Sequence, residues 1–150
     1  MRDTWTTIDD ATTLLVREYR FANNGRANTL VVRGDDGLIV VSPGSNMDAA
    51  ALDEIAERGP VRALIANNAW HHLGQPAWRA RFPDAVSYAP PEAIAALRKK
   101  YPGIAWQPLS SLRWPGHVHW RPTPGISIGE AAITVETKRG PVLYAGDLLA

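Results

Sequence analysis

The chain contains no cysteine in its 150 residues. Disulfide cross-links and thiolate metal sites are therefore excluded, and any bound metal would need histidine, aspartate, glutamate or asparagine as ligands. The sequence also lacks any apolar run near the ~20 residues that a membrane span requires. Its N-terminus, M-R-D-T-W-T-T-I-D-D, is polar and acidic, unlike a signal peptide. From these absences we expect the protein to be cytoplasmic, and we expect no association with a membrane.

An excess of charge of one sign is lacking too, since 16 Lys and Arg residues are balanced by 15 Asp and Glu residues. The net charge of +1 gives no electrostatic reason to expect nucleic acid as a partner. The content of 45% hydrophobic and 21% charged residues is that of an ordinary globular protein. Because no repeat, linker or low-complexity tract divides the chain, we expect residues 1–150 to form a single domain.

The pattern of apolar residues predicts antiparallel strands first and alternating strands and helices afterwards. A break is expected at N-N-G-R-A-N, after the first strand. This order of elements predicts a mixed α/β (α+β) layered fold. The expected strands are 14–21, 29–33, 37–41, 61–66, 86–89, 117–121, 131–137 and 141–145, and the expected helices are 48–58, 76–82 and 91–101.

Four segments, taken in this order, resemble the metallo-β-lactamase superfamily. They are N-T-L-V-V with G-L-I-V-V-S-P-G (28–44), A-N-N-A-W-H-H-L-G (66–74), T-P-G-I-S-I-G (123–129) and V-L-Y-A-G-D-L-L (142–149). The resemblance implies an αββα sandwich with metal ligands on loops at one edge of the two sheets. Family domains are longer than this chain, so we expect a truncated or reduced domain whose sandwich is incomplete on the C-terminal side. The N-x-x-x-H-H variant also resembles a poorly characterised branch known as a domain of unknown function.

Most positions that hold metal ligands in the family are occupied by other residue types in this chain. When the motifs are aligned on His72 and Gly74, the first family histidine falls on Asn67 and the second on Ala69. The family aspartate falls on His71, and within this motif only His72 keeps a ligand of the family.

The other landmarks are altered in the same way. Ile126 replaces the histidine of the P-G-H turn, and Ser42 replaces the supporting aspartate of the early turn. Asp147 keeps the aspartate of the G-D strand, and the chain ends before the position of the family's last histidine. The resemblance therefore implies a degenerate metal site, and a two-metal centre is not expected.

Two hypotheses follow, and the first assigns no metal cofactor. In it His72 and Asp147 bond to each other, a contact of about 1.5–3 kcal/mol, while His71 faces solvent or a backbone carbonyl. Asn67 and Asn68 then satisfy backbone groups at the end of the strand. The old active-site edge would serve a new purpose, binding a small molecule or a partner in a pocket lined by Asn67, Trp70, Ser42 and Ile126.

The second hypothesis is a single-metal hydrolase. His71, His72 and Asp147 would hold one zinc, iron or manganese ion, and metal-bound water would attack the substrate with Asp147 and His71 as the catalytic residues. Adjacent side chains diverge, so this site requires the backbone to turn between the two histidines.

A further expectation concerns assembly. If the helices that normally cover the second sheet are missing, an apolar sheet face is exposed and self-association is expected.

Overall fold

The computed structural model describes residues 5–124 and 129–146, which form a seven-stranded and a three-stranded sheet. The elements are β1 (Thr6–Asp9), β2 (Leu14–Phe21), η1 (Ala22–Asn24), β3 (Gly25–Arg33), β4 (Leu38–Val41), α1 (Ala49–Arg58), β5 (Val61–Ile65), α2 (Gln75–Arg81), β6 (Val86–Ala89), α3 (Pro91–Lys100), β7 (Gln107–Pro108), η2 (Leu109–Ser111), β8 (Val118–Pro122), β9 (Ala131–Thr137) and β10 (Gly140–Tyr144). No helix in the described ranges is long and apolar enough to cross a membrane.

Strands of the large sheet follow one another in chain order, from β1 to β7. The pairs from β1 to β4 are antiparallel. The pairs from β4 to β7 are parallel, and the intervening chain contains α1, α2 and α3. The predicted order, antiparallel strands and then strand–helix alternation, is therefore confirmed.

The predicted break at N-N-G-R-A-N was placed too widely. Asn23 and Asn24 adopt positive φ angles of 62° and 59°, and these two residues complete the reversal of the chain. β3 already begins at Gly25, and Arg26 pairs with Arg20 of β2. Strands β1 and β7 were not predicted, because four and two residues are too few to show a period.

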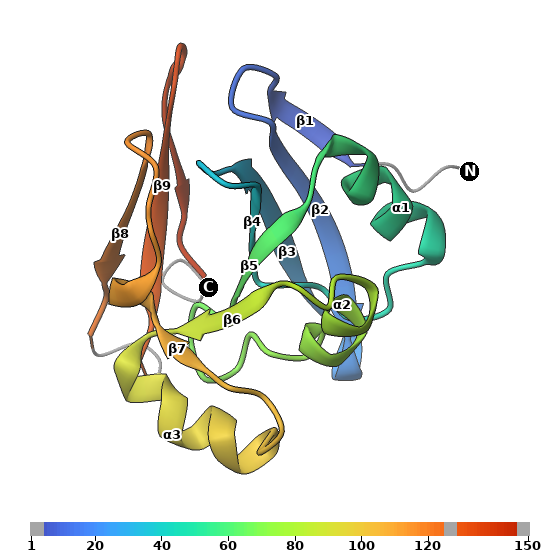
Figure 1. Ribbon diagram of the computed structural model, residues 1–150, viewed down its shortest axis with the longest axis vertical. Helices are drawn as coiled ribbons and strands as arrows, with labels where there is room; N and C mark the ends of the chain where they lie inside the picture. The colour runs from blue at the N-terminus through green and yellow to red at the C-terminus, as the bar shows by residue number, and fades with distance from the viewer. Residues whose placement is uncertain (1–4, 125–128, 147–150) are drawn as a thin grey trace.

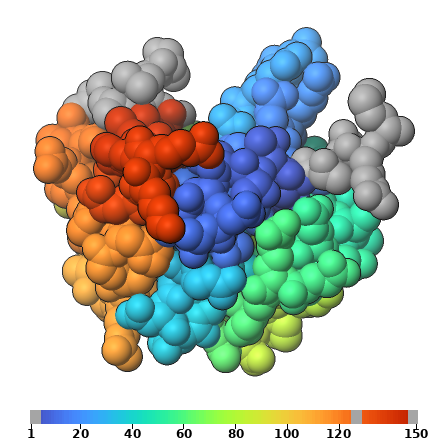
Figure 2. Space-filling view, turned by 90° about the horizontal axis from the view of Figure 1, so that it is seen from above, coloured from blue at the N-terminus to red at the C-terminus, as the bar shows by residue number. Residues whose placement is uncertain are grey.

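Both faces of the large sheet are covered, which explains the unbroken apolar runs in its central strands. Figure 1 shows α1 and α2 on one side and the three-stranded sheet on the other. Figure 2 shows the same order from above, with the blue N-terminal strands between the orange and red strands and the green segment. Side chains alternate between these two layers. Thus Val31 packs with Leu52 of α1, whereas Leu30 packs with Ile133 of β9. A third cluster packs α3 against the end of the sheet near Ala66.

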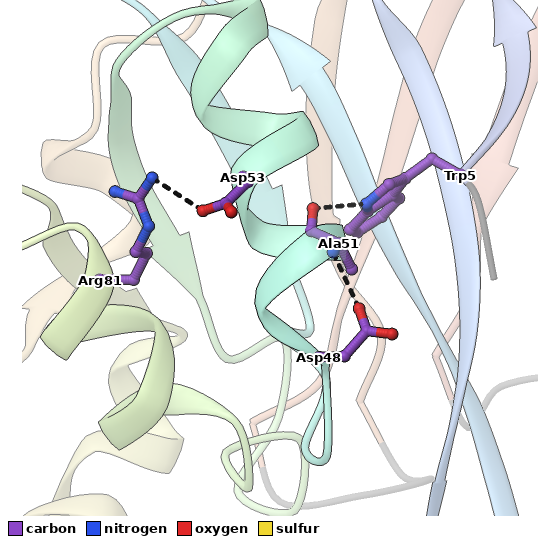
Figure 3. A network of polar contacts seen from close by, with 5 residues as sticks. All are labelled: Trp5, Asp48, Ala51, Asp53 and Arg81. Atoms are coloured by element: carbon purple, nitrogen blue, oxygen red, sulfur yellow. Dashed lines mark hydrogen bonds and ion pairs between the residues drawn. The ribbon is translucent and has the colours of Figure 1, made fainter. Parts of the chain in front are cut away.

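Polar contacts attach α1 to its neighbours (Figure 3). Asp48 caps the helix by accepting a hydrogen bond from the Ala51 amide at 2.8 Å. The Trp5 indole donates to the Ala51 carbonyl at 3.0 Å, and Arg81 of α2 reaches Asp53 at 3.2 Å. The chain before β1, helix α1 and helix α2 thus form one connected layer.

The three-stranded sheet has no helix on its outer side within the part of the chain that the structure describes (Figure 1). His119, Thr134 and Leu143 lie side by side across β8, β9 and β10 on this face. His119 and Leu143 are exposed, so the face mixes polar and apolar side chains. Self-association through this face stays a prediction, which sedimentation at several protein concentrations would test.

Candidate functional site

The site is built where two loops leave neighbouring parallel strands, the S-P-G turn after β4 and the segment 66–74 after β5. We call this second segment the His–His loop. A side-chain carbon on Gly74 would lie only 2.2 Å from the Pro43 carbonyl oxygen, so this close approach requires glycine. The Trp78 indole donates to the Gly44 carbonyl at 3.0 Å. Backbone contact and a buried indole thus fix the two loops together.

Asn68 shapes the His–His loop from within. Its Oδ1 accepts hydrogen bonds from the amides of Trp70 at 2.8 Å and His71 at 3.1 Å. Its Nδ2 donates to Glu130 Oε2 at 2.8 Å, which ties the loop to the start of β9. The expectation that Asn67 and Asn68 would satisfy backbone groups at the strand end is therefore confirmed for Asn68. It is wrong for Asn67, whose side-chain amide makes no hydrogen bond to a described residue.

His71 turns toward the S-P-G turn. Its Nδ1 lies 2.7 Å from the hydroxyl oxygen of Ser42, and the same oxygen lies 2.8 Å from the Tyr19 hydroxyl. Ser42 is fully buried and adopts a positive φ of 53°. The Thr29 hydroxyl donates to the Ser42 carbonyl at 2.8 Å and helps to hold this conformation. One serine thereby connects a tyrosine of β2 with the His–His loop.

His72 points to the end of α3. Its Nδ1 lies 2.9 Å from the Tyr101 hydroxyl, and the two rings meet edge to face with centroids 5.3 Å apart. Burial lowers the pKa of His72, and the nearby Lys100 ammonium lowers it further. Burial also raises the pKa of Tyr101. This contact therefore joins two groups that are both neutral near pH 7.

The ligand positions implied by the family pattern do not fit a two-metal centre. Ala69 offers no donor atom. Asn67 is fully buried, and neither of its side-chain amide atoms has a hydrogen-bond partner among the described residues. Among the described residues, no group of three or more His, Cys, Asp or Glu side chains could hold a metal. The predicted site residues Asp147 and Ile126 lie outside the described residues, and so does the expected bond between His72 and Asp147.

A hollow of about 240 Å³ opens between the β2–β3 hairpin and the His–His loop, and we call it the His71 hollow. Of the predicted pocket residues in the described chain, Trp70 lines it. Ser42 instead supports two of its lining residues, and Asn67 packs elsewhere, against Gly146. The residues that line the His71 hollow are Tyr19, Phe21, Ala27, Trp70, His71 and Leu73.

A larger hollow of about 650 Å³ lies along β2, and most of its lining side chains are polar or charged. Two of these charges already have partners, since Arg17 lies 3.9 Å from Asp48 and Glu18 lies 3.4 Å from Arg26. The His71 hollow is smaller, and its lining is largely apolar. It is therefore the better candidate for a ligand site.

Tyr19, Tyr101 and Glu130 contribute to this region and were not predicted from the sequence. Tyr19 and Tyr101 lie 23 and 29 residues from their hydrogen-bonded partners, and Glu130 lies 62 residues from Asn68. No local pattern signals such contacts. The register of β9, which sets the Ala131 amide against the Asn67 carbonyl at 2.8 Å, brings Glu130 into place.

No protein-family model and no curated protein matches this sequence. Solved structures do match. The crystal structure of the DIM-1 metallo-beta-lactamase exposed to ceftazidime is 18% identical with a TM-score of 0.65, over 94% of this chain and 68% of that one. The mono-zinc form of the metallo-beta-lactamase FIM-1 from Pseudomonas aeruginosa is 16% identical with a TM-score of 0.56, over 86% of this chain and 62% of that one. The chain thus spans about two thirds of these proteins, and the predicted metallo-β-lactamase fold is confirmed.

Proposed function

We propose that this protein uses the metallo-β-lactamase fold without metal, as a non-catalytic protein that binds a small molecule in the His71 hollow. One observation carries the proposal. The two adjacent imidazoles are held by hydroxyls from different elements, His71 by Ser42 after β4 and His72 by Tyr101 after α3. A shared metal ion requires the two remaining ring nitrogens to converge, and anchors on two separate elements favour rings that point apart.

Serine chemistry does not offer an alternative at this place. Ser42 and His71 have the spacing of a nucleophile and its base. However, Ser42 is fully buried, and its oxygen also contacts the Tyr19 hydroxyl. A nucleophile must reach its substrate, so Ser42 is a positioning residue for the wall of the hollow.

The single-metal hydrolase remains the second candidate, because one feature favours it. Both rings use Nδ1 for their hydroxyl contacts, and metal-bound histidines commonly hold one ring nitrogen in this way while the other binds the ion. One ion on His71, His72 and Asp147 would supply Lewis-acid activation of water.

Metal analysis of protein purified without chelator separates the two candidates. We expect no stoichiometric zinc, iron or manganese and the same melting temperature with and without chelator. Near-stoichiometric metal that is lost in His72→Ala would instead establish the hydrolase candidate. His119→Ala is the matched control, because it removes an exposed imidazole on β8, far from the His–His loop in the chain.

A further inference from the structure

Exposed apolar side chains gather at the His71 hollow. Five large hydrophobic residues are exposed in the described chain, and three of them, Phe21, Trp70 and Leu73, line this one hollow. The other two are Val86 on β6 and Leu143 on β10. Single exposed apolar residues are common, but a cluster around a concave surface marks a binding site.

The walls of the hollow are held in place before any ligand arrives. The Phe21 ring lies against the backbone of Gly25, where a side-chain carbon would be 2.2 Å from the ring. Ser42 contacts both Tyr19 and His71 from beneath. A rigid wall reduces the entropy that a ligand must overcome on binding.

Trp70 adds a wall with one face already in use. The Lys100 ammonium lies 5.9 Å from the centre of its ring, in the range of a cation–π contact. Lys100 does not line the hollow. A ligand in the hollow therefore meets the edge or the other face of the indole, away from this positive charge.

Within residues 5–124 and 129–146, the lining has no Asp, Glu, Lys or Arg side chain. An ionic group buried there would lose its hydration without gaining an opposite charge. The rings of Tyr19, Phe21 and Trp70 in the lining offer edge and face contacts to another ring. The chemistry of the lining thus favours an uncharged aromatic ligand.

The volume of about 240 Å³ sets the size of that ligand. An apolar cavity of roughly 150 Å³ accommodates benzene, whereas pockets for drug-sized ligands measure roughly 300–1,000 Å³. Resting on the proposed small-molecule function, we propose that the ligand of the His71 hollow is a neutral aromatic compound of one or two rings.

Titration with indole, followed by NMR at the Trp70 side chain and the Leu73 methyl groups, tests this inference. Phenol is the one-ring probe, cyclohexanol the neutral non-aromatic probe, and benzoate and benzylamine are the charged probes. We expect saturable shifts with indole and phenol, and at least tenfold weaker binding of the other three compounds. Leu73→Ala should weaken indole binding roughly fivefold, whereas Leu143→Ala, which truncates an exposed leucine elsewhere, should leave it unchanged.

The outcomes separate this inference from the proposed function. If cyclohexanol or a charged probe binds in the hollow as tightly as indole, the ligand class is wrong and small-molecule binding stands. If no probe shifts Trp70 or Leu73, both are wrong. If these signals change with protein concentration alone, the hollow is covered by a second copy of the chain, and the inference is likewise overturned.

Discussion

His71 and His72 are neighbours in the chain but belong to two different regions of the molecule. The His71 side joins the S-P-G turn and β2 through the buried hydroxyl of Ser42, and it borders the His71 hollow. The His72 side joins α3 through Tyr101, and the His72 side chain is buried. One side thus borders a surface that could receive a ligand, while the other is part of the packing.

The two sides together show which contacts hold the His–His loop in shape. In this chain the His–His loop is held by Asn68, by Gly74 against Pro43 and by hydroxyl partners for each imidazole. Hydrogen bonds of this kind can hold loops together without an ion. If these contacts are local, the His71 side and the His72 side should respond to substitution as separate units.

The largest loss of stability is expected at Trp78, which supports both the His71 side and the His72 side. Trp78 is fully buried and joins α2 to the S-P-G turn through its bond to Gly44. Trp78→Ala should lower the free energy of unfolding by about 3–5 kcal/mol, as measured by urea denaturation. Trp70→Ala is the control, because Trp70 is 59% exposed and its loss should cost far less. Equal losses of unfolding free energy for the two variants would contradict the role of Trp78 as a support for both sides.

The next effect separates the two sides by stability. Ser42→Ala removes a hydroxyl that contacts both Tyr19 and His71, so it should cost about 1–3 kcal/mol. Tyr101→Phe removes a single hydroxyl contact to His72 and should cost about 1 kcal/mol. Urea denaturation of both variants measures the difference. A larger loss of unfolding free energy for Tyr101→Phe than for Ser42→Ala would show that the Ser42 hydroxyl is not the stronger support.

A smaller effect separates the two sides by ligand binding. Ser42→Ala releases two wall residues of the His71 hollow and should weaken indole binding roughly fivefold, or about 1 kcal/mol. Tyr101→Phe should bind indole like the unaltered protein, because Tyr101 does not line the hollow. Calorimetric titration gives both affinities. If Tyr101→Phe weakens indole binding and Ser42→Ala does not, the ligand site does not belong to the His71 side.

The smallest effect is a pH dependence confined to the His72 side. Folding lowers the pKa of His72 below its ordinary value of 6.5, so below about pH 7 the unfolded chain binds more protons than the folded one. Stability should therefore fall as the pH decreases from 7, and level off below the lowered pKa. His72→Gln should flatten this slope in denaturation at several pH values. His119→Gln, at an exposed position, should retain it.

Sequence reasoning could reach the fold but only part of the site. Long β-branched runs and the Ala-rich pattern of α1 depend on local periods, so the strands around Val31 and the helix around Ile55 were predicted. The hydroxyl partners Tyr19 and Tyr101 depend on how distant elements pack, and no local pattern encodes that. The turn that divides His71 from His72 depends on Asn68, whose role was foreseen only in part.

The divergence of the two imidazoles is tested most directly by NMR of their ring nitrogens during titration with zinc. We expect the nitrogen signals of His71 and His72 to keep their positions when one equivalent of zinc is added, because Ser42 and Tyr101 hold the rings apart. If the signals of both rings shift together and saturate at one zinc per chain, the rings converge on one ion and the proposed metal-free role of the His–His loop is wrong.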